Sequence, residues 1–402
     1  MWAMCCGRGE IMPQLAQMKY CTGCGACANA CPKDCISMTA DAEGFHYPIV
    51  DAARCVRCGL CEKACPVIGG DFCRDNPAAY AVHNRDAEVV GSSSSGGVFA
   101  AIAEWVIGQG GVVYGAAFRE DLSVSHLRVD AKECLGIFRG SKYLQSDVGS
   151  AFRCVAQDLK AGRKVLFSGT PCQAAALHRY LGRTYEELLT VDVICHSVPS
   201  PKAWRRYLDA LQARERSKIV FANFRDKRDS WQGYYLCTQL ENGREIVRTG
   251  EENQYMRAFL QGLSTRPSCY HCRFKGSNRG SDITLGDFWG VETAAPEAYH
   301  AAGTSLVLIN SPKGQSALAG IAEKLELRPV NEAAALEGNP AYSAPSAPHP
   351  RRAEFFASLE QEEFDDLVNH LLAPTKWEKL KQRWSRSIVC RGFRKLRRLI
   401  SL

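Results

Sequence analysis

The alternation of hydrophobic and polar positions divides the chain into a short N-terminal segment and a longer body. From residue 78 onward, apolar runs of strand length alternate with stretches whose apolar residues recur at helical spacing. Helices are expected at 98–107, 148–161, 173–181 and 201–212, and strands at 111–118, 124–130, 164–168, 188–195 and 305–309. This order predicts an α/β (mixed α+β) body around a buried, at least partly parallel sheet.

Turn and linker signals complete the outline of the chain. Asn242-Gly243 lies at the centre of a hairpin expected over 234–247. Residues 331–350 are rich in Ala, Pro and Asn, which is typical of a linker. The predicted units are an extension (1–17), a metal-binding module (18–76), an α/β body (77–330), a linker (331–374) and a basic amphipathic tail (375–402).

Composition indicates a soluble, intracellular class of protein. The 402 residues suffice for two or three domains, and 46% are hydrophobic and 23% charged. No apolar run reaches the length of a membrane span, and residues 1–17 lack the features of a signal peptide. The 20 cysteines cluster at metal-ligand spacing, so a reducing cytoplasm explains them better than disulfides do.

The positive charge of the chain is concentrated at its C-terminus. Residues 376–402 carry ten Lys and Arg but one acid, while the rest of the chain is close to neutral, which argues against nucleic-acid binding. In this tail, apolar residues recur at near-helical spacing: Leu380, Trp384, Ile388, Phe393, Leu396 and Ile400. The pattern suits a helix on an anionic membrane surface at the inner face of the membrane, on an acidic partner, or packed on its own domain.

An internal repeat of cysteines marks the N-terminal module. Cys21, Cys24, Cys27 and Cys31-Pro32 recur at the same spacing as Cys55, Cys58, Cys61 and Cys65-Pro66. A C-x2-C-x2-C loop can wrap three thiolates around one [4Fe–4S] cube, and the Cys followed by Pro reaches the other cube. The repeat therefore predicts two clusters, one held by Cys21, Cys24, Cys27 and Cys65 and the other by Cys55, Cys58, Cys61 and Cys31.

The alternative for these cysteines is a zinc site. Zinc is bound by paired C-x2-C units and has no use for a third Cys and a Cys-Pro in each repeat. Cys35 and Cys73 fall outside both motifs and are expected to be plain thiols.

A second set of cysteines follows two strands of the predicted sheet. Cys172 comes directly after the strand at 164–168, and Cys195 ends the strand at 188–195. If these strands are parallel, both thiols lie at the carboxyl edge of one sheet, where α/β folds bind ligands. Cys269 and Cys272 form a further C-x2-C. Together the four thiols equal the number that a third [4Fe–4S] cluster requires, although separate thiols or a structural zinc are also open.

A Gly/Ser run from residue 91 to 97 opens the helix expected at 98–107. Small residues allow a close approach of the backbone, and the helix N-terminus donates free N–H groups, so the run suits the diphosphate of FAD. A flexible turn is the alternative. The chain contains no G-x-G-x-x-G after a strand and no G-x4-G-K-[ST], so a standard Rossmann or P-loop site is not supported.

Six motifs in fixed order resemble the β subunit of coenzyme F420 hydrogenase/dehydrogenase. They are SSGGV at 94–98, GSKY at 140–143, GTPCQ at 169–173, CHSVPSP at 195–201, CYHCRFK at 269–275 and SDITLGDFWG at 281–290. The resemblance covers residues 18 to about 312 and divides the body into an N-terminal-like domain (77–200) and a C-terminal-like domain (201–330).

The resemblance implies an iron–sulfur flavoprotein that exchanges a hydride with a substrate stacked on FAD. It implies that Ser94, Ser95, Gly96 and Gly97 contact the FAD phosphates and that Asp282, Gly286 and Asp287 lie along the flavin. Lys142 becomes the candidate catalytic charge near the flavin ring or the substrate, with a surface lysine as the alternative. The cluster at Cys172, Cys195, Cys269 and Cys272 would relay electrons to FAD.

The expected function is therefore an oxidoreductase. Electrons from a ferredoxin or a partner redox subunit would enter at the N-terminal clusters and pass through FAD to a small organic hydride acceptor, with the reverse direction also open. The acceptor would be coenzyme F420 or an unidentified compound, which some bacterial relatives link to polysaccharide biosynthesis. The alternatives are an electron-relay subunit without its own substrate and a redox-sensing accessory protein.

Overall fold

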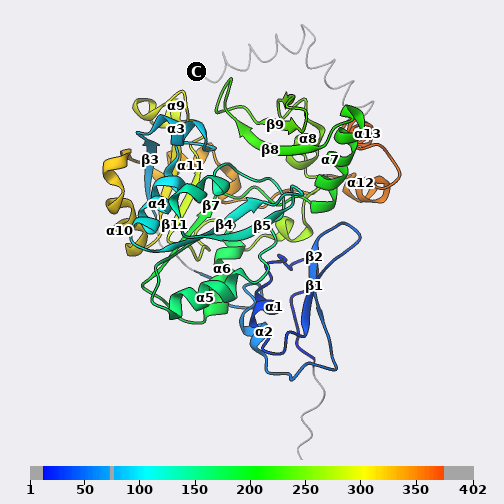
Figure 1. The fold of residues 1–402 in the computed structure, drawn as a ribbon, viewed down its shortest axis with the longest axis horizontal. Coiled ribbons are helices and arrows are strands. Elements are labelled where there is room, and N and C mark those ends of the chain that lie inside the picture. The colour runs from blue at the N-terminus through cyan, green and yellow to red at the C-terminus, as the bar shows by residue number, and fades with distance from the viewer. Residues whose placement is uncertain (1–11, 73–76, 375–402) are drawn as a thin grey trace, which may run out of the picture.

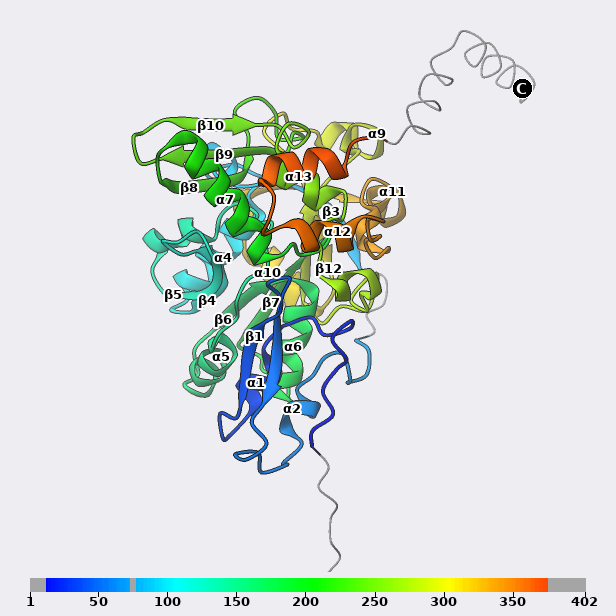
Figure 2. The same cartoon turned by 90° about the vertical axis from the view of Figure 1, so that its right-hand side faces the viewer.

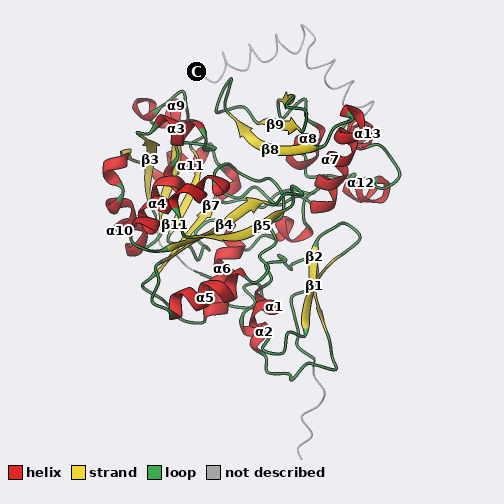
Figure 3. Cartoon of the chain, viewed as in Figure 1, coloured by secondary structure: helices red, strands yellow, loops and turns green. Residues whose placement is uncertain are grey.

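A mixed eight-stranded sheet forms the centre of the body in the computed structural model, which describes residues 12–72 and 77–374 (Figures 1 and 3). In spatial order its strands are β13 (Leu325–Val330), β3 (Ala78–Asn84), β12 (Ser305–Ile309), β11 (Ile283–Asp287), β7 (Leu188–Val193), β6 (Val165–Gly169), β4 (Val112–Phe118) and β5 (Val124–Val129). The four strands β11, β7, β6 and β4 run parallel, and the outer strands pair antiparallel. The predicted α/β class with a partly parallel sheet is thereby confirmed.

Helices cover both faces of this sheet. On one face α4 (Val98–Gly108) and α10 (Pro312–Gly320) pack on the alternate strand residues Val113, Leu166 and Val191. On the other face α5 (Ala151–Lys160) and α6 (Pro171–Leu181) pack on Val112, Val165 and Phe167. Because successive strand residues point to opposite faces, the apolar residues of β6 and β7 contribute to both cores.

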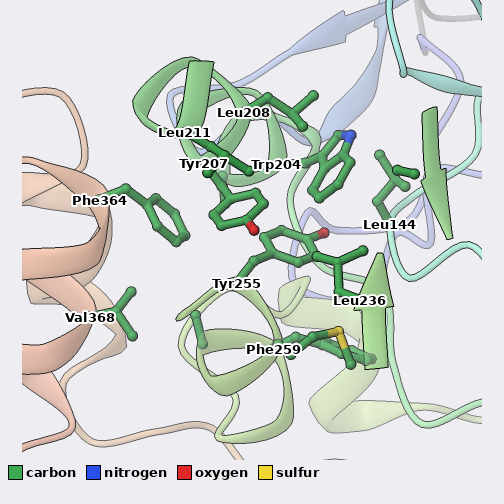
Figure 4. Packing of buried hydrophobic residues seen from close by; sticks show 14 of the residues in the cluster. Leu144, Trp204, Tyr207, Leu208, Leu211, Leu236, Tyr255, Phe259, Phe364 and Val368 are labelled. Carbon is green, nitrogen blue, oxygen red and sulfur yellow. The ribbon is translucent and has the colours of Figure 1, made fainter. Parts of the chain in front are cut away.

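A second lobe packs beside the sheet around a core rich in aromatic residues (Figure 4). It consists of a three-stranded sheet, β10 (Glu245–Arg248), β9 (Tyr235–Leu240) and β8 (Ile219–Asp226), with helices α7 (Pro201–Glu215), α8 (Gln254–Leu260), α12 (Arg352–Ser358) and α13 (Phe364–Leu371). Trp204 of α7, Tyr255 of α8 and Phe364 of α13 are fully buried there. The β9–β10 pair confirms the predicted hairpin, whose Gly243 has φ +83°.

The predicted linker at 331–374 is a folded part of the body. It forms α11 (Glu332–Glu337), α12 and α13, and α12 and α13 bury Phe355, Leu359 and Leu367 in the core of the second lobe. The Ala/Pro/Asn composition is confined to 331–350, whereas 351–372 has an apolar periodicity that closes a core. The structure also has no boundary at residue 200, because the central sheet takes strands from both sides of it.

The N-terminal module is a small unit that rests on the α5/α6 face of the body (Figures 1 and 2). It contains α1 (Ala26–Ala30), the antiparallel pair β1 (Ile36–Ala40) and β2 (His46–Val50), and α2 (Leu60–Lys63). Arg153 of α5 fixes α1 by donating to the carbonyls of Ala28, Asn29 and Cys31. Ala26 and Ala64 are buried against the same face. The module is therefore docked on the sheet domain.

The remaining short elements are α3 (Ala87–Gly91), α9 (Val291–Ala294) and five 3₁₀ helices between 132 and 342. No helix within 12–72 and 77–374 combines the length and apolarity that a membrane span needs. Residues 1–11, Cys73 and the basic tail at 375–402 lie outside the described residues, so the tail's predicted helix stays a prediction.

Candidate functional site

Two small cavities in the module each lie against four of the repeated cysteines. One is lined by Cys21, Cys24, Cys27 and Cys65, and the other by Cys31, Cys55, Cys58 and Cys61. In each set, three cysteines come from one loop and the fourth comes from the other repeat. The two loops enter α1 and α2 in the same way, through left-handed glycines Gly25 and Gly59 with φ +72°. The structure thus brings together both crossed sets of thiols.

The thiols of the first set are half-buried, and as thiolates they repel one another. Burial, followed by the charges of Cys21 and Cys65, raises the pKa of Cys24 to about 12. A cationic metal core among these sulfurs would offset that cost, because thiolates are the ligands of iron–sulfur clusters. Within the described part of the chain, no three His, Cys, Asp or Glu side chains converge on a single-ion site. The third Cys and the Cys-Pro of each repeat fit a cluster rather than one zinc ion.

Cys35 lies in the second cavity as a fifth thiol. Its Sγ is 3.2 Å from Cys31 Sγ, and its backbone N–H donates to the same sulfur over 3.4 Å. The sequence pattern places Cys35 outside the ligand set, and its backbone contact is that of a residue supporting a ligand sulfur.

This arrangement predicts different outcomes for the two neighbouring thiols. Cys35→Ala is expected to keep the iron content of the anaerobically purified chain, because four other thiols line the cavity. Cys31→Ala is expected to lose about four irons. Iron quantification per chain checks both, and a loss of iron in Cys35→Ala would show that Cys35 is a ligand.

The third set of thiols, which consists of Cys172, Cys195, Cys269 and Cys272, also comes together. Strands β6 and β7 are adjacent and parallel, which puts Cys172, in the first turn of α6, and Cys195, just after β7, at the same edge. Cys269 lies in the 3₁₀ helix η2 (Pro267–His271), and Cys272 ends it. Burial raises the pKa of Cys172, Cys195 and Cys269 to about 12 each, and charges within the set add to the effect. Four mutually repelling thiols in one buried place match a cluster's donor set.

A large pocket opens at this carboxyl edge. It has a volume of about 600 Å³, within the range of cofactor and ligand sites. Cys172 and Cys195 line it together with Ser93–Ser95, Gly97 and Lys142. Tyr143, Tyr234, Phe259 and Trp289 supply an aromatic part of its wall, and Thr22 of the N-terminal module reaches it as well. The pocket therefore adjoins both the third set of thiols and the module.

The Ser/Gly loop forms one side of the pocket and is held rigidly. Ser94 Oγ accepts a hydrogen bond from the Ser141 backbone N–H (2.7 Å), and Ser95 Oγ donates to the Thr304 carbonyl (2.9 Å). Lys227 Nζ donates to the carbonyls of Val90 and Ser95. Gly97, with φ +80°, is the N-cap of α4 and brings no side-chain acceptor to the first N–H groups of the helix. These amides are therefore available to an anionic ligand.

Lys142 lines the pocket, and among the described residues no carboxylate forms an ion pair with it. Its Nζ donates to the carbonyls of Ile137 (2.9 Å) and Arg139 (3.0 Å). Burial lowers the pKa of Lys142 to about 7. A lysine poised near neutrality can either supply a charge or move a proton at the pocket.

The residues at and before β11 that were expected to contact the flavin do not all lie at the pocket. Gly286 and Asp287, at the carboxyl end, line the pocket. Asp282 precedes the strand and is buried away from the pocket, where it accepts from Thr190 N (2.8 Å), Thr190 Oγ1 (2.7 Å) and Ser311 Oγ (2.6 Å). A five-residue strand separates its two ends by more than the reach of one side chain. The structure therefore does not bring Asp282 together with Gly286 and Asp287 at the pocket.

Gly96 has a structural position within its loop. It is absent from the pocket lining, and its backbone N–H donates to Ser305 Oγ (2.9 Å). A Cβ at residue 96 would lie 2.4 Å from the Val82 carbonyl. Gly96 therefore allows the loop to cross the end of the sheet, and its neighbours Ser94, Ser95 and Gly97 face the pocket.

Arg225 supports the pocket and was not identified from the sequence. Its guanidinium forms a 2.5 Å ion pair with Asp287, and its side chain is 1% exposed. It also donates to the Ser94 carbonyl and stacks on the rings of Tyr234 and Trp289. The residue lies in β8, outside every motif, so no spacing signal marks it. Arg225 thus joins the Ser/Gly loop to the end of β11.

Comparisons with known proteins give two family matches. Residues 162–333 match the model for the C terminus of the coenzyme F420 hydrogenase/dehydrogenase beta subunit, and residues 20–68 match the 4Fe-4S dicluster domain. The first match starts inside the 77–200 unit expected from the sequence.

A similar solved structure is a chain of the F420-reducing [NiFe] hydrogenase complex from Methanosarcina barkeri. It is 17% identical, with 75% of this chain and 93% of that chain covered and a TM-score of 0.44. No curated protein sequence matches the chain.

The crossed thiol sets coincide with the dicluster domain, and all cysteines of the third set fall within the other match. The chain therefore carries a region similar to the C terminus of the coenzyme F420 hydrogenase/dehydrogenase beta subunit at residues 162–333 and a 4Fe-4S dicluster domain at residues 20–68.

Proposed function

We propose that the chain is an FAD-dependent iron–sulfur oxidoreductase with three [4Fe–4S] clusters and its own organic substrate. One observation carries this proposal: Cys172 and Cys195 line the same pocket as the Ser93–Gly97 loop and Lys142. A one-electron site and a site for an organic cofactor thus adjoin each other. When bound, FAD would exchange single electrons with the clusters and electron pairs with a hydride donor or acceptor.

The pocket residues suit the binding of FAD. The loop amides and the first turn of α4 would hold its diphosphate, as helix N-termini hold anions. Tyr143, Tyr234, Phe259 and Trp289 offer apolar faces to a planar ring system. Arg225, which is paired with Asp287, holds the Ser/Gly loop through the Ser94 carbonyl and packs on the ring of Tyr234. Lys142 would supply a positive charge, or a proton, at the edge of the bound ring.

The N-terminal module would admit electrons from a ferredoxin or a partner redox subunit. Cys58 is exposed, while the Cys24 side of the module is buried against the body. The second cluster would therefore face a donor, and the first would face the third thiol set. An electron relay without a substrate needs no pocket of about 600 Å³, so this pocket favours the enzyme over the relay.

An acceptor screen tests the proposed function. The anaerobic protein is reduced with a ferredoxin, mixed with coenzyme F420, NAD(P)⁺ or keto-sugar nucleotides, and followed by absorbance. We expect fast reoxidation by one organic acceptor, with hydride appearing in the product. Reoxidation only by one-electron acceptors would support the relay instead.

Lys142 has an expected effect on both flavin binding and stability. Lys142→Met is expected to weaken FAD binding roughly tenfold to a hundredfold, since it removes a charged contact of ~1.5–3 kcal/mol. Because burial lowers the pKa of Lys142 to about 7, the folded chain binds fewer protons than the unfolded chain between about pH 7 and the ordinary pKa of lysine. Burial of the charged Lys142 therefore lowers the free energy of unfolding by its full amount below pH 7. This destabilisation disappears as the pH rises toward 10.

The flavin-free variant is thus expected to be more stable than the flavin-free wild type at pH 6.5, with a smaller difference at pH 9.5. Urea unfolding at the two pH values measures the difference. A difference that is equal at both pH values would contradict the burial of a charged Lys142.

A further inference from the structure

Arg266 is a fully buried cation between the N-terminal module and the third set of cysteines. It lies three residues before Cys269, at the start of η2, so it belongs to the body. Its guanidinium reaches into the module, where Nε donates to the Cys21 carbonyl (2.9 Å) and Nη2 to the His46 carbonyl (3.0 Å). Nη1 donates to Gln145 Oε1 (2.8 Å). The side chain therefore connects a predicted ligand of the first cluster with the segment that carries two ligands of the third.

The charge of Arg266 has no anionic partner in these hydrogen bonds. All three acceptors are uncharged oxygens, and the guanidinium also packs on the rings of Tyr47 (4.4 Å) and Phe45 (5.3 Å). Burial of a charge is costly unless an opposite charge compensates it. Arg352 also joins body and module, but its charge is compensated, because its guanidinium binds both carboxylate oxygens of Glu43.

Gly23, between Cys21 and Cys24, shows how closely the arginine approaches the first thiol loop. A Cβ at residue 23 would lie 2.8 Å from Arg266 Nη1 and 2.6 Å from Gln145 Nε2, and φ at Gly23 is +67°. The first C-x2-C loop thus leaves room for the guanidinium. Arg266 is also joined directly to the third set, because the backbone N–H of Cys269 donates to the Arg266 carbonyl (3.0 Å).

We propose that Arg266 is the shared countercharge of two clusters, the one held by Cys21, Cys24, Cys27 and Cys65 and the one held by Cys172, Cys195, Cys269 and Cys272. A [4Fe–4S] core with four thiolates is anionic, and each becomes more negative when it gains an electron. A fixed cation between the two clusters stabilises the reduced state of each and so raises both reduction potentials. Arg266 is in this sense a tuning residue of the electron path, and the inference rests on the clusters of the proposed function.

Redox titration of the anaerobic, cluster-loaded chain, followed by electron paramagnetic resonance, tests this proposal. In Arg266→Gln, at the wild-type midpoint potential, the reduced-to-oxidised ratio of both clusters is expected to fall about tenfold, which for one electron is ~59 mV. Arg266→Lys keeps the charge and is expected to remain close to the wild type. The cluster of Cys31, Cys55, Cys58 and Cys61 serves as an internal reference, since no hydrogen bond of Arg266 reaches its loops.

A matched control separates charge from docking. The double variant Arg352→Gln with Glu43→Gln removes another arginine contact between body and module without a change in net charge. It is expected to leave all midpoint potentials in place. Potentials that stay unchanged in Arg266→Gln, or that fall equally in this control, would overturn the proposal.

If Arg266→Gln takes up no clusters, urea unfolding of the cluster-free variant and the cluster-free wild type tests the proposal instead. Without clusters the wild-type charge is uncompensated, so unloaded Arg266→Gln is expected to unfold in urea no earlier than the unloaded wild type. Clearly earlier unfolding would make Arg266 a structural residue and overturn the proposal. A wild-type chain that binds no clusters would overturn the proposed function itself, whereas altered flavin content alone would leave this inference intact.

Discussion

Replacement of Cys172 by serine is expected to remove about four irons per chain and to abolish electron transfer from the module to the pocket. Cys172 lies in the first turn of α6, and burial together with the nearby thiols of Cys272 and Cys195 raises the pKa of its half-buried thiol. A neutral hydroxyl cannot replace a thiolate ligand, and the remaining three thiols do not complete a cluster's donor set. Iron and acid-labile sulfide per chain, measured after anaerobic purification, check the loss.

Cys154→Ser is the matched control for Cys172→Ser. Cys154 is a half-buried thiol of α5 whose hydrogen-bond contact is Ser150, and it belongs to none of the three thiol sets. This variant is expected to keep its iron and its rate of electron transfer. If Cys172→Ser retained the full iron content, the third cluster would have to be abandoned, while the two N-terminal sets would be unaffected.

Replacement of Asp287 by alanine is expected to destabilise the flavin-free chain by ~3–5 kcal/mol, since it leaves a buried guanidinium without its carboxylate. Arg225 is 1% exposed, and its Nε already lacks a hydrogen-bond partner among the described residues. The two carbonyls that it contacts, of Ser94 and Trp231, do not neutralise its charge. The midpoint of urea unfolding under anaerobic conditions measures the loss.

Two further variants make the Asp287 result specific. Asp226→Ala, in the same strand as Arg225, breaks the ion pair with Arg228, which is 43% exposed, and is expected to cost at most ~1 kcal/mol. The double variant Arg225→Met with Asp287→Leu removes both charges and is expected to recover much of the stability lost in Asp287→Ala. Equal costs for Asp287→Ala and Asp226→Ala would contradict a buried, mutually dependent pair at the pocket.

Regular spacing made the thiol sets and much of the sheet predictable. Cys21 to Cys31 and Cys55 to Cys65 repeat at fixed intervals, and the structure places them in the expected crossed sets. The apolar run at 305–309 coincides with β12 in both of its bounds. Strand β3 was missed because Tyr80 and His83 interrupt its apolar pattern, although the strand lies between β13 and β12. Local pattern thus identifies elements with one continuous apolar signal.

Residues that act through long-range contacts were not predictable from spacing. Arg225 pairs with Asp287 across 62 residues, and Arg266 contacts Cys21 across 245 residues. Each is a single arginine outside any repeat, and only the fold reveals its burial. Asp282 shows the reverse case, since it belongs to the same motif as Asp287 but lies at the opposite end of β11, away from the pocket. Sequence proximity therefore indicates a shared strand but not a shared site.

The most direct test of the proposed redox assignment is the cofactor content of the anaerobically purified chain. We expect a brown protein with about twelve irons, an equal amount of acid-labile sulfide and one FAD per chain. About eight irons per chain without flavin would support the two clusters of the N-terminal module but would contradict the assignment as a flavin-dependent reductase. A colourless chain, with zinc or no metal at the cysteine sulfurs, would contradict the assignment at its foundation.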